Sequence, residues 1–169
     1  MSRMLWVDDD EERFVYERTV LGEQGWRIDW AKTVEEAAVR LGAQAYQVVV
    51  LDQMVPSAEV GPRSPLIVWA GCRLLWWIRG RSDWERVPGQ TGPGPAGAEW
   101  ACLTSADTPP SINVATPALI VSGIYEPAVF DRTRSASAFD KDVTFLAKPL
   151  EPEALIRVAG RKVRTSVPP

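Results

Sequence analysis

The chain has 169 residues with 19 Lys and Arg, 22 Asp and Glu and a formal net charge of −3, and its charges are scattered. This length suits one domain with a complete core. Scattered charges exclude the clustered basic surface that binds phosphate backbones, so we expect neither a second folded domain nor a nucleic-acid partner. No apolar run reaches the roughly 20 residues that span a bilayer, and the acidic N-terminus is unlike a signal peptide, which predicts a cytoplasmic protein without membrane contact.

Residue types that are missing or isolated limit the chemistry. The chain has no histidine, which excludes Ser-His-Asp and Cys-His catalysis and histidine-ligated zinc. Cys72 and Cys102 have no partners at metal-ligand spacing, and we expect both to be reduced and buried. Any chemistry must therefore come from carboxylates, hydroxyls and lysine.

The first part of the chain alternates between strand and helix patterns. Residues 3–7, "RMLWV", predict a strand, and residues 11–25 have helix-forming composition and a closing glycine. A second strand is predicted at residues 27–31, and the capping box at residues 33–36 predicts the start of a second helix. Residues 47–51 are apolar on both faces, which is typical of a central parallel strand.

The second part of the chain continues this alternation. Residues 71–80 predict a third helix, residues 118–122 a fourth strand and residues from about 126 to 138 a fourth helix. A fifth strand is predicted at residues 143–147, and the last helix from residue 152 to about residue 163.

Strands that alternate with helices imply a parallel sheet with helices on both faces, because right-handed crossovers place them there. We therefore predict a doubly wound α/β domain with a five-stranded parallel sheet at residues 1–165. A short tail at residues 166–169 follows, and no output domain is expected after it. Residues from about 57 to 70 and from about 80 to 116 do not fit the alternation, and we interpret them as insertions.

Polar residues follow four of the predicted strands, at the edge where functional groups collect in an open parallel sheet. Asp8 and Asp9 follow the first strand, Asp52 the third, Ser122 the fourth and Lys148 the fifth. Neighbouring carboxylates raise one another's pKa unless a cation lies among them, and an all-oxygen site suits Mg²⁺. The acidic pair is therefore predicted to bind Mg²⁺, and Asp52 to attack phosphorus. The ammonium of Lys148 would neutralise charge on the phosphoryl oxygens, and the Ser122 hydroxyl would donate a hydrogen bond to them.

Each of these residues also has a purely structural explanation. An Asp at the end of a strand is most often a helix cap or turn former, Asp8 and Asp9 can cap the first helix, Lys-Pro is a common turn, and a serine after a strand usually bonds the backbone. The functional hypothesis depends on the joint order of the five residues, because independent capping residues need not follow four different strands of one sheet.

With these residues in this order, the chain resembles a response-regulator receiver domain of two-component signalling, which has a flavodoxin-like fold. The segments that carry the resemblance are "LWVDDDEE", "VVVLDQMVP", "LIVSG" and "FLAKPLEPEAL", and "GCRLLWWIR" resembles the third helix of the family. The resemblance implies that Asp8 and Asp9 bind Mg²⁺ together with Asp52. It implies that a histidine kinase or phosphotransfer protein phosphorylates Asp52, and that Ser122 then moves toward the phosphate.

The resemblance extends to the last predicted strand and to the output of the domain. Phe145 matches the aromatic that turns inward in this family, and Lys148-Pro149 resembles the cis peptide of the family. A downstream protein partner is implied, and a homodimer is compatible with the resemblance. Beyond self-phosphorylation and slow loss of the phosphoryl group, no enzymatic turnover is expected.

The chain departs from the family near the phosphoacceptor. The glycine that normally follows the proline after a short turn is not found at that spacing after Pro56, so the loop is longer. The two positions that influence hydrolysis in the family are Met54 and Ile124 here. Neither side chain can hydrogen-bond an attacking water, which predicts a slowly hydrolysed phosphoryl group.

Besides a phosphorylation-dependent switch, two other functions are compatible with these residues. A constitutive interaction module would use Trp84 and Trp100 in the insertion and Trp76-Trp77 in the neighbouring helix. A phosphohydrolase of the haloacid-dehalogenase type would share the Asp nucleophile. It is disfavoured because Met54 stands where that family has a second Asp, and because the acidic pair there comes last rather than first.

Overall fold

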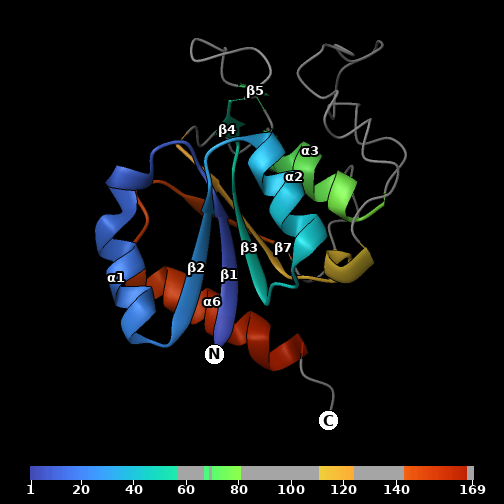
Figure 1. The fold of residues 1–169 in the computed structure, drawn as a ribbon. Helices are drawn as coiled ribbons and strands as arrows, with labels where there is room; N and C mark the ends of the chain where they lie inside the picture. Colours follow the sequence, from blue (N-terminus) through green and yellow to red (C-terminus); the bar gives the residue numbers. More distant parts are fainter. Residues whose placement is uncertain (57–66, 69, 81–110, 124–142, 167–169) are drawn as a thin grey trace.

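The computed structural model describes residues 1–56, 67–68, 70–80, 111–123 and 143–166 (Figure 1). The strands are β1 (Ser2–Val7), β2 (Trp26–Ala31), β3 (Val48–Asp52), β4 (Met54–Val55), β5 (Ile67–Val68), β6 (Ala118–Ser122) and β7 (Val143–Ala147). The helices are η1 (Glu11–Phe14), α1 (Val15–Glu23), α2 (Val34–Ala43), α3 (Ala70–Ile78), η4 (Ser111–Asn113) and α6 (Pro152–Ser166). The helix predicted at residues 126 to 138 lies outside the described residues.

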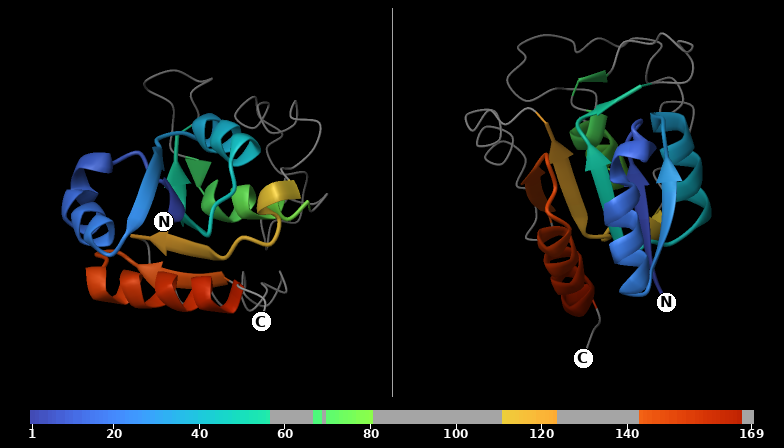
Figure 2. Two further views of the ribbon diagram at one scale, coloured as in Figure 1. Left: turned by 60° about the horizontal axis from the view of Figure 1, so that its bottom comes forward. Right: turned by 90° about the vertical axis from the view of Figure 1, so that its left-hand side faces the viewer.

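Five parallel strands form the central sheet in the order β2-β1-β3-β6-β7. The chain passes from β1 outward to β2 and then crosses to β3 on the other side, so the strand order reverses between β1 and β3. Helices lie on both faces of the sheet, with α1 and α6 on one face and α2 and α3 on the other (Figure 2). The predicted doubly wound, five-stranded fold is confirmed, and it places the carboxyl ends of β1 and β3 side by side.

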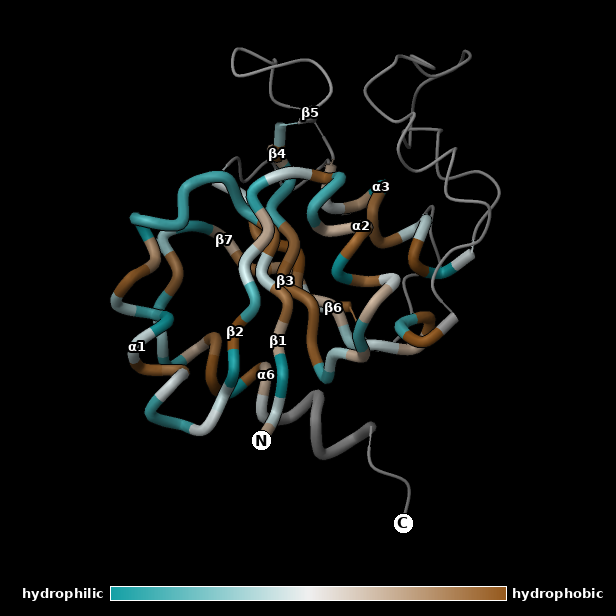
Figure 3. The backbone as a smooth tube through the Cα atoms, viewed as in Figure 1, coloured by the Kyte–Doolittle hydropathy of each residue, from teal (hydrophilic) through white to brown (hydrophobic). Residues whose placement is uncertain are grey.

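The alternation of side chains along the strands builds two cores, one on each face. In β1, Leu5 and Val7 pack with α2 and α3, whereas Met4 and Trp6 pack with α1 and α6. These four side chains are at most 1% exposed. The tube in Figure 3 is hydrophobic along the central strands and changes between hydrophilic and hydrophobic along α1. Because burial of each large apolar side chain contributes about 1.5–3 kcal/mol, the two cores fix the strand register.

The first helix begins differently from the sequence prediction. Residues 11–14 form a 3₁₀ turn, and the Asp10 carboxylate caps it by accepting the Arg13 N–H at 3.2 Å. The tighter turn changes the direction of the side chains, so that Phe14 is 2% exposed whereas Val15 is 58% exposed. The α-helix proper ends before Gly25, whose φ of 85° reverses the chain into β2.

The capping box predicted for the second helix is present. The Thr33 hydroxyl oxygen accepts the Glu36 N–H at 3.2 Å, and the Glu36 carboxylate accepts the Lys32 N–H at 2.9 Å. Two N–H groups near the start of α2 are thereby satisfied, which explains why the helix starts at Val34.

Both segments interpreted as insertions contain residues that are joined to the rest of the domain. Strand β5 pairs with β4 in a separate antiparallel sheet, in the register Met54↔Val68 and Val55↔Ile67. At the other segment, the Arg79 guanidinium donates to the main-chain oxygen of Thr116 at 2.8 Å. The ends of these segments are therefore part of the described fold.

Among the described helices, none is long and apolar enough to cross a membrane.

A buried asparagine at the end of η4, which no sequence pattern singles out, bonds the end of α2 and the residues just before β3 and β6. The Asn113 amide donates to the main-chain oxygens of Leu41 and Gln44, both at 2.7 Å, at the end of α2. Its side-chain oxygen accepts the Tyr46 N–H at 3.0 Å and lies 3.3 Å from the Thr116 hydroxyl. Asn113 thus satisfies carbonyl groups that the end of a helix leaves open.

Asn113→Ala is expected to lower the free energy of unfolding by about 2 kcal/mol, because several buried main-chain groups lose their partner. Urea denaturation measures this change. Val114→Ala is the matched control, since its side chain is 43% exposed and should change stability by less than about 0.5 kcal/mol. Equal effects of the two substitutions would contradict the role of Asn113.

Candidate functional site

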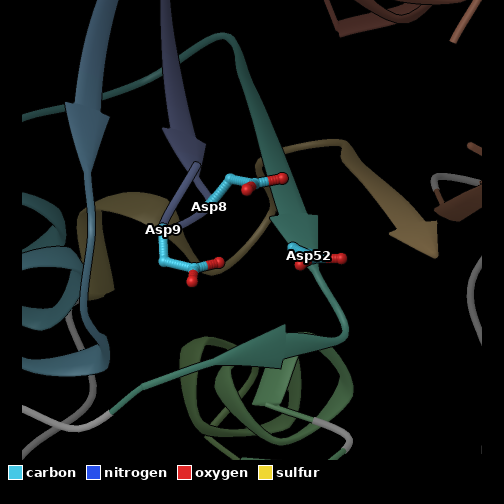
Figure 4. Close-up of side chains that lie close together, drawn as sticks. All are labelled: Asp8, Asp9 and Asp52. Atoms are coloured by element: carbon cyan, nitrogen blue, oxygen red, sulfur yellow. The ribbon is translucent and has the colours of Figure 1, made fainter. Parts of the chain in front are cut away.

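Three carboxylates meet at the carboxyl edge of the sheet (Figure 4). Asp8 and Asp9 follow β1, Asp52 ends β3, and each offers an oxygen within 4.8 Å of the others. The register of β1 and β3, which pairs Val7 with Leu51, makes Asp8 and Asp52 neighbours. Asp8 and Asp52 are 1% and 6% exposed, whereas Asp9 is exposed, so the site is buried on one side and open to solvent on the other.

A lysine lies among the buried carboxylates, as predicted. The Lys148 Nζ is 2.7 Å from Asp8 Oδ2 and 3.2 Å from Asp52 Oδ2. The main chain of Lys148 is held in turn by its N–H, which donates to the Ser122 main-chain oxygen at 2.8 Å. Because β6 lies between β3 and β7, this bond fixes the direction from which the lysine reaches the acids. The Lys148-Pro149 peptide is cis, as the resemblance implies.

The two residues proposed as switch positions lie on the strands beside the site. Ser122 ends β6 and is 5% exposed. Phe145 is half-buried in β7, where it pairs with Ile120 and packs against the core on the α2 and α3 face. The structure therefore brings all five predicted polar residues to one edge and places Phe145 within the adjoining strand.

The positive charge beside the two buried carboxylates is not enough to offset the cost of burying them. Burial, together with the charge of Asp8, raises the pKa of Asp52 to about 6 against the lowering effect of Lys148. Burial likewise raises the pKa of Asp8, against the lowering effect of Lys148. One ammonium thus does not compensate for the desolvation of two carboxylates. The all-oxygen set of three carboxylates therefore fits a divalent cation such as Mg²⁺.

Asp8 is positioned by the neighbouring strand β2. Its main-chain N–H donates to the Ala31 oxygen at 3.0 Å, and its main-chain oxygen accepts the indole N–H of Trp30 at 2.7 Å. Its carboxylate oxygen Oδ1 accepts the Asp10 N–H at 3.0 Å. These bonds leave Oδ2 directed toward Lys148, so the orientation of the carboxylate is set by groups outside the acidic cluster.

Asp52 is positioned from the side of α3, through the residue that follows it. The Gln53 N–H donates to Asp52 Oδ1 at 2.8 Å, and the Gln53 main-chain oxygen accepts the Ala70 N–H at 3.0 Å. The Gln53 amide lies 2.9 Å from the Cys72 Sγ, and its side-chain oxygen accepts the Cys72 N–H at 3.3 Å. Cys72 is buried as predicted, and burial raises the pKa of its thiol to about 12. Its partnership with Gln53 has no signal in the sequence.

Gly71 allows α3 to approach Asp52. A Cβ at this position would lie 2.6 Å from the Asp52 main-chain oxygen and 3.1 Å from the Leu51 main-chain oxygen. Only glycine therefore fits here without a shift of the main chain. In the sequence, Gly71 is recognisable only as a glycine at the start of an apolar helix. The long segment between Pro56 and this helix gives no indication that the glycine lies against Asp52.

The tryptophans that carried the interaction hypothesis lie in different environments. Trp76 and Trp77 in α3 are 4% and 3% exposed, so neither offers a free surface. Trp84, Trp100 and Ile124 lie outside the described residues. Met54, two residues after Asp52, is partly buried in β4.

No family model matches the chain, and no curated protein matches it. Solved structures do match, among them the receiver domain of the Francisella response regulator 1452. It has a TM-score of 0.63 and 18% identity, with 99% of this chain and 100% of that chain covered. The chain has the receiver-domain fold.

Two further structures support this assignment of the receiver fold. A response regulator from Desulfuromonas acetoxidans has a TM-score of 0.62 at 12% identity, and the match covers 99% of this chain and 100% of that one. A response regulator protein from Burkholderia pseudomallei has a TM-score of 0.52 at 16% identity, and the match covers 98% of this chain and 70% of that one. The Burkholderia protein was solved with a phosphorylated aspartic acid, a calcium ion and citrate.

Proposed function

We propose that the protein is a phosphorylation-dependent switch of a two-component phosphorelay and that Asp52 accepts the phosphoryl group. The observation that carries the proposal is the contact of Lys148 Nζ with both Asp8 and Asp52 at the carboxyl edge of a receiver-type sheet. The donor would be a histidine kinase or a phosphotransfer protein. The presence of a phosphorylated aspartic acid in the Burkholderia protein supports the same chemistry.

In the proposed step, a carboxylate oxygen of Asp52 attacks the phosphorus of the donor. The bond from phosphorus to Asp52 forms while the bond from phosphorus to the donor atom breaks, and the leaving group keeps the electron pair. The Gln53 N–H holds Oδ1 at 2.8 Å, which orients the carboxylate. The Lys148 ammonium passes from the Asp52 oxygen to an oxygen of the arriving phosphoryl group, where it neutralises charge.

Mg²⁺ is part of this proposal, because the acidic cluster offers the oxygen ligands that the ion prefers. Asp8, Asp9 and Asp52 would hold it. When bound, the ion supplies positive charge that offsets the negative charge of the carboxylates and the phosphoryl oxygens. The roles of the chain's own residues are to hold the ion and, through Lys148, to place a second positive charge.

The output is a shift between two conformations rather than chemical turnover. Ser122 would donate a hydrogen bond to the phosphoryl group, and Phe145 would change its exposure on the adjoining strand. Phe145 is half-buried and packs against the core on the α2 and α3 face, so a change in its exposure would alter this packing. A downstream partner would then recognise the phosphorylated surface.

The test is incubation of the purified protein with Mg²⁺ and acetyl phosphate, followed by intact mass spectrometry. We expect one phosphoryl adduct on the wild type, none on Asp52→Asn, and none when the divalent ion is chelated. Circular dichroism confirms that the variant is folded. An adduct of equal yield on Asp52→Asn would refute the assignment of the phosphoacceptor, and a folded wild type without any adduct would count against the switch.

The phosphoryl group is expected to be lost slowly. Met54 and Ile124 have no side-chain atom that can hydrogen-bond a water in line with phosphorus, so replacing them with polar residues should speed hydrolysis by about tenfold. The measurement is the decay of purified phosphoprotein for the wild type and the Met54→Asn, Ile124→Glu variant. The idea fails if the wild type loses its label faster than the variant.

A further inference from the structure

The ammonium of Lys148 is enclosed by an aromatic ring as well as by its two carboxylate partners. It has three N–H donors, and Asp8 and Asp52 accept from two directions, at 2.7 and 3.2 Å. Phe14 covers another side, with its ring centroid 5.2 Å from Nζ. The Lys148 side chain is 9% exposed and Phe14 is 2% exposed, so water has little access to the ammonium.

Phe14 is held in this place by local structure and by packing. The 3₁₀ turn capped by Asp10 directs its side chain inward, as described above. Its ring packs against two tryptophans, with centroid distances of 5.0 Å to Trp6 and 6.0 Å to Trp30. Trp6 and Trp30 also stack on each other at 5.1 Å, and Trp30 donates to the Asp8 main chain. The ring is therefore part of a fixed wall behind the site.

We propose that Phe14 is a positioning residue for Lys148. The face of its ring attracts the ammonium and keeps it beside Asp52 while the ammonium exchanges a carboxylate oxygen for a phosphoryl oxygen. An aromatic face suits this task because its attraction for a cation lacks the narrow directionality of a hydrogen bond, so the ammonium can move across the site without losing this contact. The exchange step rests on the proposed function, whereas the contact itself does not.

A second buried position in the apolar cluster of Phe14 has no aromatic ring. Leu21 belongs to the same apolar cluster as Phe14 and is fully buried, but it lies on a later turn of α1. A substitution at Leu21 therefore disturbs the packing of that cluster without removing the aromatic face from Lys148. Leu21→Ala is the matched control for the structural effect of Phe14→Leu.

Nuclear magnetic resonance tests the contact without any phosphorylation. The chain contains four lysines, Lys32, Lys141, Lys148 and Lys162, so a sample labelled with ¹³C-lysine gives few ε-methylene signals. We expect the Lys148 signal, assigned by its loss in Lys148→Arg, to be shifted upfield by the aromatic ring. The upfield shift should persist in Phe14→Tyr and Leu21→Ala and disappear in Phe14→Leu. A Lys148 signal that does not differ between the wild type and Phe14→Leu would overturn the proposal.

Phosphorylation by acetyl phosphate tests the consequence. Phe14→Leu should lower the rate at saturating donor by about tenfold, whereas Phe14→Tyr, which keeps the ring, should restore it to within about twofold of the wild type. Leu21→Ala should leave the rate unchanged even though it lowers the melting temperature. In a Lys148→Met background, Phe14→Leu should have no further effect, since the ammonium is absent.

The two measurements separate the inference from the proposed function. If Phe14→Leu lowers the rate equally with and without Lys148, the ring does not act through the lysine and the inference is wrong. If the wild type accepts no phosphoryl group at all, the proposed function fails, and the ¹³C spectra still decide whether Phe14 holds the ammonium.

Discussion

Gly71→Ala is expected to lower the free energy of unfolding by about 3 kcal/mol and to slow phosphorylation of Asp52. The new Cβ would lie 2.6 Å from the main-chain oxygen of the phosphoacceptor itself, and a main-chain atom cannot turn aside as a flexible side chain can. Either α3 moves outward or the end of β3 moves, and each movement disturbs the bonds of Gln53 to Ala70 and Cys72. Urea denaturation and the rate of adduct formation with acetyl phosphate measure the two effects.

Gly22→Ala is the matched control for this prediction. Gly22 lies inside α1, and a Cβ there would meet nothing within 4 Å. Alanine is a better helix former than glycine, so this variant should be more stable by about 0.5–1 kcal/mol and should be phosphorylated normally. If Gly71→Ala behaved like Gly22→Ala, close packing of α3 on Asp52 would be excluded.

The fold was predictable because it depends on patterns that are local in the sequence. Residues 48–51 and 118–121 are apolar and buried on both faces of the sheet, as expected of central strands between two helix layers. The capping box at residues 33–36 fixed the start of α2 within a single turn of chain. The acids and the lysine were predictable for a related reason, since each follows a strand and the topology then brings the strand ends together.

The residues that support the site were not predictable, because their partners are distant in sequence or depend on exact geometry. Gln53 and Cys72 are nineteen positions apart and are separated by the longer loop. Asn113 meets the end of α2 about seventy positions earlier. Phe14 reaches Lys148 only because a 3₁₀ turn replaces the first turn of the expected helix. A pattern of helix formers does not distinguish these two kinds of turn.

The two buried acids are held by different parts of the fold, so a phosphoryl group at the site could change how these parts are linked. Asp8 is held by Trp30 and Ala31 of β2, whereas Asp52 is held through Gln53 by the first turn of α3. Lys148 is the described residue that contacts both acids. If a phosphoryl oxygen replaced the Asp52 oxygen as a partner of Lys148, as proposed, the link between the two supports would weaken. Lys148 directly follows β7, the strand that contains Phe145, so a movement of the lysine would reach the proposed switch position.

Asp52→Asn is expected to raise the free energy of unfolding by about 3 kcal/mol at pH 7 in the absence of Mg²⁺. Burial raises the pKa of Asp52 to about 6 from an ordinary value of 3.8, so the folded protein binds a proton more tightly than the unfolded chain does. For a carboxyl with a raised pKa, stability is greatest at low pH and falls as pH rises from about 4 to about 6. At neutral pH the wild type therefore carries the full cost of a buried charge, which Asn removes.

Urea denaturation at pH 7 and at pH 4.5, with and without Mg²⁺, tests whether Asp52→Asn raises the free energy of unfolding. The gain should be largest at pH 7 without Mg²⁺, and it should shrink at pH 4.5, where Asp52 in the folded wild type is mostly protonated. It should also shrink with Mg²⁺, because a bound cation offsets the charge that burial penalises. Glu12→Gln is the control, since this exposed carboxylate lies outside the acidic cluster and its replacement should change stability by less than about 0.5 kcal/mol. A loss of stability on Asp52→Asn at pH 7 would show that the ion pair with Lys148 outweighs the cost of burying Asp52. In that case Asp52 would stabilise the fold, and its burial would be no sign of a nucleophile.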